Sequence, residues 1–351
     1  MASAKNTKYK LSIAGYSTDI ILLRHTDGRL FCTKSGDLCT FDRNGANKQV
    51  LYSFALNGYS GHNVNGAILL PSGTMLVALT AYDQTLKFLR STNSEYTTWE
   101  LVNSDWNGGM LYRGWDVSPS GVVIAGEYPT HTNILSVRLW KITNDGRTWE
   151  VIHTFNGRQG TLTEQKQIFH IHVVQYDKYT GNYWIGTGDQ DPEPSVWLYN
   201  GTTTRMIGEG TQLWRQCSFI ITPKYVVWGC DGEVYVDSVR TIYTVRLDKE
   251  TEQMELVDVV QSTIFNNEEL RMGELYLSCG TPNEINLSNN AKDWYNVLNL
   301  TLNPDLPNAY SWFYDFVDNL DGRIFGYVTG IMRDDTGVPL THGTVILDIT
   351  K

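Results

Sequence analysis

The sequence predicts an all-β protein, a seven-bladed β-propeller formed by one domain over residues 1–351, with N- and C-terminal strands that close the ring. Two repeated turn motifs and the composition support this prediction. The chain contains 31 Gly, 20 Tyr and 11 Trp but only 19% charged residues, which is typical of short strands, tight turns and aromatic packing rather than amphipathic helices. Closed β folds of such length commonly form one domain.

One hairpin motif occurs twice in closely similar form. It reads ITNDGRTW at residues 142–149 and LSNNAKDW at residues 287–294. In both copies an alternating run enters a turn that contains Asn, whose side chain can hydrogen-bond its own backbone, and a Trp then anchors the next strand. Recurrence of this kind along a chain indicates stacked supersecondary units.

A second motif, a tight turn followed by a β-rich run, recurs seven times. The intervals of about 45 to 60 residues match the length of a four-stranded propeller blade. Five copies contain glycine and two keep the position without it. The copies lie at residues 27–31, 72–76, 120–124, 180–184, 223–228, 267–270 and 321–325.

Each predicted blade consists of an inner strand, this tight turn, a second strand, a third strand, the Asn or Asp hairpin and an outer strand. A β-sandwich is the alternative, but it would not require the same order of turns seven times. The terminal runs 9–14 and 344–349 both alternate, and we expect them to share a blade that protects the sheet edges. The hairpin ends in Trp at residues 90–99, 142–149 and 287–294, and lacks Trp at residues 42–45, 199–202 and 248–251.

Charge and hydropathy argue against two kinds of partner. The formal net charge is −10 and no basic cluster is present, so we expect no nucleic-acid partner. No apolar run approaches the roughly 18 residues of a membrane span, and the first residues are polar, so we expect neither a membrane partner nor a secretion signal. The expected locations are a phage virion, the extracellular space by another route, or the cytoplasm.

The five cysteines have no CxxC spacing, which argues against a zinc ribbon or a disulfide framework. A bridge between Cys32 and Cys39 is one alternative. The sequence favours the other, in which all five are small buried hydrophobic residues. They are Cys32, Cys39, Cys217, Cys230 and Cys279.

The hairpin at residues 142–149 resembles the Asp-box, or BNR, repeat of the sialidase-like superfamily, whose pattern is Ser-x-Asp-x-Gly-x-Thr-Trp. Gly146, Thr148 and Trp149 match this pattern, whereas Ile142 and Asn144 replace its Ser and Asp. In that superfamily the repeat is structural and lies away from the active centre, so the resemblance implies a fold rather than a chemistry. The Arg-Ile-Pro motif of true sialidases is absent, which argues against sialidase activity.

In a propeller, the residues before inner strands and after second strands converge on one face. Here these positions are rich in Arg, His, carboxylates and aromatic residues. Such residues suit sugars and their acidic derivatives, because Arg binds carboxylates and His and acids transfer protons. The predicted substrate-binding residues are His62, Arg113, Trp115, Glu127, Trp214, Asp231, Trp312 and Tyr314.

The predicted catalytic residues are His170, His172, Arg215, Asp189 and Tyr128. His170 and His172 alternate along one run and therefore point to the same face. A His-x-His pair is half of a metal site, but no third ligand is evident nearby in sequence. We therefore expect no cofactor and keep a divalent metal as the alternative. A buried Arg215 would need an acidic partner or a ligand.

This set of residues looks like Asp-box proteins catalogued as glycosyl hydrolases, and the architecture is similar to seven-bladed polysaccharide lyases that use His, Tyr and Arg on uronates. The resemblance implies a glycan partner, for which we expect an acidic glycan, and it transfers no catalytic residue. Cleavage of an acidic polysaccharide or oligosaccharide is the first hypothesis. A non-catalytic glycan-binding propeller and a structural adaptor, such as a phage tail component, are the alternatives.

Cleavage could follow two routes. In a lyase, Arg113 or Arg215 would neutralise a uronate carboxylate while a histidine and a tyrosine, Tyr128 or Tyr314, moved protons. A glycoside hydrolase would need two carboxylates about 5 to 9.5 Å apart. The candidates for that pair are Glu127, Asp189, Asp231 and Glu233.

Overall fold

The computed structural model describes residues 10–17, 19–34, 36–83, 85–130, 134–158, 167–231, 234–236, 239–241, 243–257, 269–270, 275–280, 284–299, 312–318, 323–332 and 339–350. Two compact units divide the chain. The first comprises Met1–Cys32, Phe41–Asn47 and Ile220–Lys351, and the second comprises Thr33–Thr40 and Lys48–Phe219. The prediction of one domain over residues 1–351 stays a prediction.

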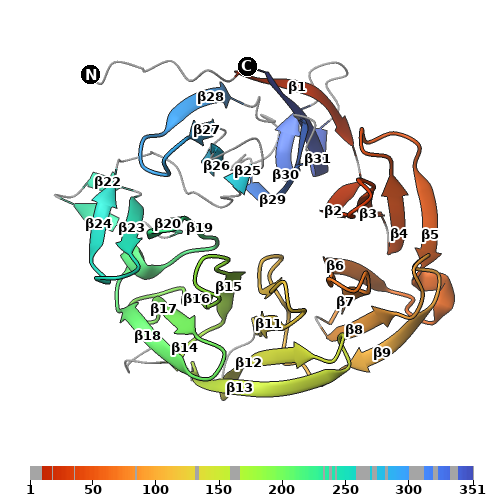
Figure 1. The fold of residues 1–351 in the computed structure, drawn as a ribbon, viewed down its shortest axis with the longest axis horizontal. Coiled ribbons are helices and arrows are strands. Elements are labelled where there is room, and N and C mark those ends of the chain that lie inside the picture. The colour runs from red at the N-terminus through yellow and green to blue at the C-terminus, as the bar shows by residue number, and fades with distance from the viewer. Residues whose placement is uncertain are drawn as a thin grey trace. The chain divides into compact units, whose positions relative to one another are not determined.

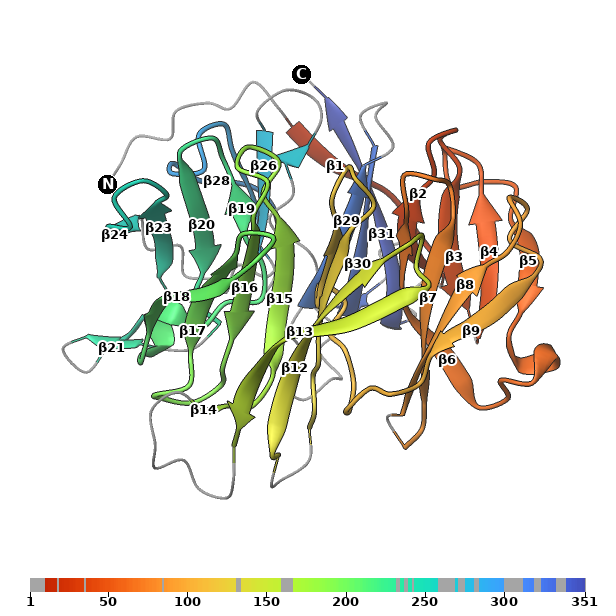
Figure 2. The ribbon, with the colours of Figure 1, turned by 60° about the horizontal axis from the view of Figure 1, so that its bottom comes forward.

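The second unit contains three consecutive sheets (Figure 1). One has the strand order β6 (His62–Leu69), β7 (Met75–Ala81), β8 (Leu86–Ser91) and β9 (Trp99–Asn103). The next is β10 (Trp115–Val117), β11 (Val123–Gly126), β12 (Ser136–Thr143), β13 (Thr148–Gly157) and β14 (Gln167–Ile168). In the third, β15 (Ile171–Tyr176), β16 (Tyr183–Thr187), β17 (Ser195–Tyr199) and β18 (Thr204–Glu209) lie side by side (Figure 2).

The first unit contains three further sheets of four strands. The first has the order β19 (Ile220–Ile221), β20 (Tyr225–Gly229), β23 (Thr244–Asp248) and β24 (Met254–Val257). The second has the order β25 (Glu269–Leu270), β26 (Leu275–Gly280), β27 (Glu284–Ser288) and β28 (Tyr295–Asn299). The third has the order β1 (Lys10–Ser17), β31 (Pro339–Thr350), β30 (Arg323–Met332) and β29 (Trp312–Asp318). Strands β21 (Val234–Val236) and β22 (Val239–Thr241) form a separate pair.

The remaining sheet, β2 (Ile20–Arg24), β3 (Leu30–Lys34), β4 (Asp37–Phe41) and β5 (Gln49–Ser53), takes residues from both units. With it, the described chain has seven sheets of four or five strands, besides the β21–β22 pair. Two short 3-10 helices, η1 (Ala55–Asn57) and η2 (Gln212–Trp214), accompany them, and no described helix could cross a membrane. The fold class is therefore all-β, a seven-bladed β-propeller, as predicted.

The two ends of the chain share a sheet, as the terminal alternating runs predicted. Strand β1 pairs antiparallel with β31, from Lys10 opposite Thr350 to Ser17 opposite Thr344. Thr344 strengthens this junction, because its Oγ1 donates to the carbonyl of Asp19 at 2.8 Å and accepts from the N–H of Ile21 at 3.2 Å. The pairing covers an edge of β31 that would otherwise be open to another chain.

The repeated Trp hairpins share one backbone feature. A residue with positive φ precedes each Trp by three positions: Tyr96 (57°), Gly146 (87°) and Ala291 (54°). Trp99 Nε1 donates to the Tyr96 carbonyl at 3.1 Å, and Trp149 Nε1 donates to the Gly146 carbonyl at 2.9 Å. Trp99 begins β9, Trp149 is the second residue of β13 and Trp294 directly precedes β28, so the three tryptophans occupy corresponding places after their hairpin turns.

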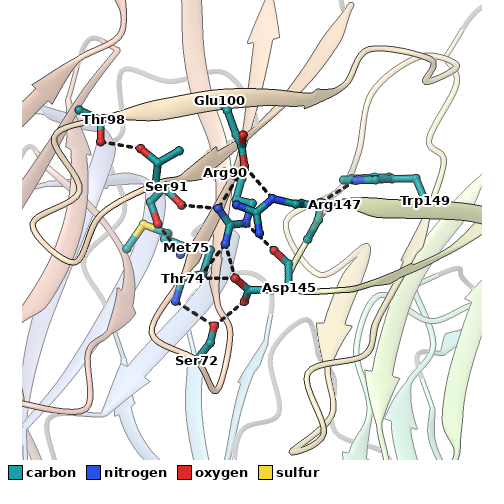
Figure 3. Close-up of polar contacts among 12 residues, drawn as sticks. Ser72, Thr74, Met75, Arg90, Ser91, Thr98, Glu100, Asp145, Arg147 and Trp149 are labelled. Atoms are coloured by element: carbon teal, nitrogen blue, oxygen red, sulfur yellow. Dashed lines mark hydrogen bonds and ion pairs between the residues drawn. The ribbon is translucent and has the colours of Figure 1, made fainter.

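The turn of one hairpin also joins two neighbouring sheets of the second unit (Figure 3). Asp145 accepts hydrogen bonds from Ser72 Oγ at 2.5 Å and Thr74 Oγ1 at 2.9 Å, both in the turn before β7. It also pairs with Arg90 of β8, whose Nη1 lies 3.1 Å from Glu100 Oε1. The hairpin motif therefore connects blades as well as ending strands.

Four cysteines belong to the described side chains, and none of these four forms a disulfide. Cys32, Cys39 and Cys230 are buried, as expected, and burial raises the pKa of Cys230 to about 12. Cys217 differs from the expectation because it is only half-buried. The side chain of Cys279 lies outside the described residues.

Candidate functional site

Two histidines of the second unit face each other where β15 begins. His170 directly precedes β15 and His172 is its second residue. The β15–β16 register jumps between Ile171 and Val173, so His172 is the extra residue of a β-bulge, a feature that re-aims side chains. The two Nε2 atoms are 2.8 Å apart, and both side chains are only 2% exposed.

Asp189 joins the two histidines from the end of β16. Its Oδ1 lies 3.3 Å from Nε2 of His170 and 3.3 Å from Nε2 of His172. Arg215 Nη2 lies 3.1 Å from the same oxygen. One carboxylate oxygen is therefore the meeting point of three other side chains that were predicted to be catalytic.

Tyr128 completes the group from the loop after β11. Its ring stacks on His170 with centroids 3.7 Å apart and planes 17° apart. We call Tyr128, His170, His172, Asp189 and Arg215 the histidine cluster. The five predicted catalytic residues thus come together within one unit, and their catalytic role stays a prediction.

Backbone carbonyls determine which ring nitrogens carry hydrogen. His170 Nδ1 lies 3.2 Å from the Pro129 carbonyl, and His172 Nδ1 lies 3.1 Å from the Gln216 carbonyl. A carbonyl can only accept, so each Nδ1 is the donor and each Nε2 of a neutral ring presents a lone pair. Both lone pairs point toward the other ring and Asp189.

Burial sets the charge of this cluster. It lowers the pKa of His170 to about 4, although the negative charge of Asp189 works to raise it, so this imidazole is neutral at pH 7. Burial also works to raise the pKa of Asp189, but its contacts with His170 and His172 outweigh burial and hold that pKa well below its usual range. The cluster therefore contains an ionised carboxylate.

Glu193 holds the backbone of Asp189 in place. Its buried carboxylate accepts the backbone N–H groups of Asp189 and Gln190, each at 3.1 Å. Gln212 Nε2 donates to the Asp189 carbonyl at 3.1 Å from the other side. Glu193 was not predicted from the sequence. The only sequence signal for it is its position between Pro192 and Pro194, which is typical of an ordered turn.

Replacing Glu193 with alanine is expected to destabilise the protein, because it leaves the N–H groups of Asp189 and Gln190 without their acceptor. Each unsatisfied buried group costs about 1 to 3 kcal/mol, measurable by urea unfolding. Glu193→Gln should lose much less, since an amide oxygen can still accept. An exposed control, Glu150→Ala on β13, should change little, and an effect equal to that of Glu193→Ala would contradict this assignment.

Two predicted substrate-binding residues are instead enclosed by protein. Glu127 is 0% exposed, and it accepts from Arg138 Nε at 2.7 Å and from the Arg138 and Asn107 N–H groups at 2.8 and 3.1 Å. Trp115 is buried in a core that includes Phe88, with ring centroids 5.9 Å apart. Both side chains therefore contact other parts of the protein, and their role in substrate binding stays a prediction.

The other predicted binding residues of the second unit are Arg113, Trp214 and His62. The Arg113 carbonyl accepts the Val174 N–H at 2.8 Å, which places Arg113 beside that strand. Trp214 precedes Arg215 and covers Gly208, where an added Cβ would meet its ring at 2.2 Å. His62 begins β6, and its ring contacts Tyr59 edge-on.

Three predicted residues belong to the first unit. Asp231 lies two residues after the end of β20. Trp312 and Tyr314 are on β29, but their side chains lie outside the described residues, as does Glu233. All four residues belong to the first unit.

Fold and cluster together define a seven-bladed β-propeller with a buried histidine pair joined to an Asp–Arg ion pair. The structure is similar to Raptor from Chaetomium thermophilum, with a TM-score of 0.57 and 11% identity over 97% of this chain and 29% of that one. It is also similar to the WD40 β-propeller domain of Doa1, with a TM-score of 0.56 and 12% identity over 97% of each chain. Sqt1 from Saccharomyces cerevisiae gives a TM-score of 0.57 and 10% identity over 97% of this chain and 100% of that one.

These similarities establish the propeller fold, since the identities are too low to show more. The present chain spans only 29% of the Raptor chain. No protein-family model matches the sequence, and no curated protein matches it. The function must therefore be argued from the cluster itself.

Proposed function

We propose that the protein binds an acidic saccharide at the histidine cluster. The observation that carries this proposal is the exposure of the ion pair: the side chains of Asp189 and Arg215 are 24% and 25% exposed, whereas the histidines beneath them are 2% exposed. A guanidinium has five N–H donors in a planar fork, so it can contact a ligand carboxylate while it keeps Asp189. Half-buried Tyr128, which stacks on His170, adds an aromatic ring to the cluster.

Fixed orientation also favours binding. Glu193 and Gln212 hold the Asp189 backbone, and Asp189 contacts Arg215. Ligand binding therefore costs little conformational entropy at the guanidinium. The resemblance of the predicted site residues to those of Asp-box glycosyl hydrolases and of polysaccharide-lyase propellers supports a glycan as the ligand. A carboxylated sugar is the form that an Arg and an aromatic ring recognise together.

Cleavage is the second candidate, and one observation favours the lyase route over the hydrolase route. Tyr128 stacks on His170, and His170 and Arg215 both contact Asp189 Oδ1, so a phenol and a guanidinium that could neutralise a uronate belong to the same cluster. A hydrolase would need a second carboxylate. Glu127 is enclosed by Arg138 and is therefore unsuited to that role.

Titration calorimetry against uronate oligosaccharides and neutral oligosaccharides of equal length tests the proposal. We expect binding of the uronates only, and Arg215→Ala should weaken it by about tenfold or more, because it removes a charge-assisted contact. Arg147→Ala, which removes an arginine that is half exposed on a hairpin, should not change the affinity.

The same samples show whether the ligand is cleaved. Ultraviolet absorbance of an unsaturated product, together with reducing ends, would identify a lyase, and reducing ends alone would identify a hydrolase. A folded protein that neither binds nor cleaves any acidic saccharide would overturn the proposal and favour the structural adaptor.

A further inference from the structure

Three electron-pair donors of the histidine cluster converge on one small volume. They are His170 Nε2, His172 Nε2 and Asp189 Oδ1, with separations of 2.8, 3.3 and 3.3 Å. The Nδ1 contacts with the Pro129 and Gln216 carbonyls assign both Nε2 atoms as lone-pair acceptors in the neutral rings. Acceptors at such distances repel each other unless a cation lies among them.

We propose that His170 Nε2, His172 Nε2 and Asp189 Oδ1 bind a divalent transition-metal ion, of which zinc is the best match. Two imidazoles and one carboxylate are the ligand types of catalytic zinc sites, and such sites keep a fourth position open. Imidazole nitrogen disfavours magnesium and calcium, which prefer oxygen ligands.

The spacing suits a tetrahedral ion. Ligand bonds of about 2.0 to 2.1 Å at tetrahedral angles place donor atoms about 3.3 to 3.4 Å apart. Both nitrogen–oxygen separations already have this value. The two nitrogens must separate by about half an ångström from 2.8 Å, a movement that a small rotation of one ring provides.

The surroundings resemble the outer shell of a metal site. Histidine ligands typically donate their other ring N–H to a carbonyl or carboxylate, as His170 and His172 do here. Arg215 Nη2 contacts the ligand oxygen of Asp189, and Glu193 fixes the Asp189 backbone. These contacts hold the three donors in place before an ion arrives.

The open coordination position would lie on the side of Asp189 and Arg215, because the histidines are buried and those two residues are a quarter exposed. A zinc ion, one carboxylate and one guanidinium sum to a net charge of +2 in this cluster. Such a site would attract an anionic ligand, and only this consequence rests on the proposed saccharide function.

Zinc binding is measured on the chelator-stripped full chain by competition with a chromophoric chelator at pH 7, with no saccharide present. We expect one ion per chain in the parent. His172→Ala and the isosteric Asp189→Asn should each weaken zinc binding by at least about a hundredfold, because loss of even an outer-shell partner costs about 10- to 100-fold. Cobalt(II) should give the visible absorption of a four- or five-coordinate site in the parent and lose it in both variants.

Cys217→Ser and His25→Ala are the matched controls. Cys217 Sγ lies 3.7 Å from His172 Nδ1, on the ring edge opposite to the proposed ligand atom, so its replacement should leave zinc affinity unchanged. His25 belongs to the first unit, where it pairs with Asp27. Circular dichroism confirms that each variant is folded.

A folded parent that binds no zinc or cobalt would overturn the proposal and indicate a proton shared between the two histidines. Unchanged zinc affinity in both His172→Ala and Asp189→Asn would overturn it as well. Saccharide binding measured in the presence of chelator tests the proposed function separately, so either result can fail without the other.

Discussion

Arg90→Ala is expected to lower the free energy of unfolding by about 2 to 4 kcal/mol, because it removes a buried guanidinium and several charge-assisted hydrogen bonds that contribute about 1.5 to 3 kcal/mol each. The Arg90 side chain is 6% exposed and contacts Asp145, Glu100 and the Ser91 carbonyl, the last at 3.1 Å. Its Nε also donates to the Asp145 carbonyl at 2.5 Å. Urea unfolding followed by circular dichroism measures the loss.

Arg147→Ala is the matched control. Arg147 also pairs with Glu100, at 3.2 Å, but its side chain is 50% exposed. Exposed pairs contribute at most about 1 kcal/mol. Equal losses in the two variants would show that the contacts between Arg90 and the hairpin do not stabilise the unit.

Acid should weaken this same connection. Burial works to raise the pKa of Asp145, but hydrogen bonds from Ser72, Arg90 and Thr74 outweigh burial and lower that pKa below its ordinary value. A carboxylate with a lower pKa in the folded state stabilises the protein above its unfolded pKa, near 3.9, and loses this contribution as the pH falls through the folded value. The stability difference between the parent and Arg90→Ala should therefore shrink as the pH falls below about 4.

Glu127→Ala is expected to cost a similar amount, about 3 to 5 kcal/mol, because it removes the buried partner of Arg138. Trp140 Nε1, which donates to Glu127 Oε1 at 3.2 Å, and the Asn107 and Arg138 N–H groups lose their acceptor as well. Thermal and urea unfolding of the purified variant measure the effect.

Glu127→Gln separates the structural role from a role in ligand binding. The amide keeps an acceptor for the backbone N–H groups, so it should recover part of the lost stability. Saccharide affinity of the folded Gln variant should equal that of the parent, since the carboxylate faces Arg138. A large loss of affinity with little loss of stability would restore Glu127 as a substrate-binding residue.

Local sequence carried enough information to predict part of the site. His170 and His172 alternate along one run, so a shared face followed from strand geometry alone. Asp189 follows the second strand of the same blade, and the β15–β16 register, with Ile171 opposite Thr187, brings that strand end beside the histidines. Asp189, the third ligand of the proposed zinc site, is therefore separated from the histidines in sequence but adjacent to them across a hairpin.

Two of the predicted binding residues have partners that the repeat did not predict. Glu127 and Trp115 lie at strand ends, where the repeat predicts a shared face. A position at a strand end does not determine which residues its side chain contacts. Glu127 meets Arg138 from the third strand of its own sheet, and Trp115 meets Phe88 of a neighbouring sheet. These are long-range contacts, so their partners cannot be recognised from spacing.

The sequence by itself determined the blade repeat, the Trp hairpins and the pairing of the chain ends, because turn chemistry and strand alternation act over a few residues. Tertiary structure alone decided which polar side chains are buried in ion pairs and which reach solvent. It also decided the tautomers of His170 and His172, since the Pro129 and Gln216 carbonyls come from other loops. Burial and hydrogen-bond partners are properties of the packed chain, and they determine whether a histidine pair can hold an ion.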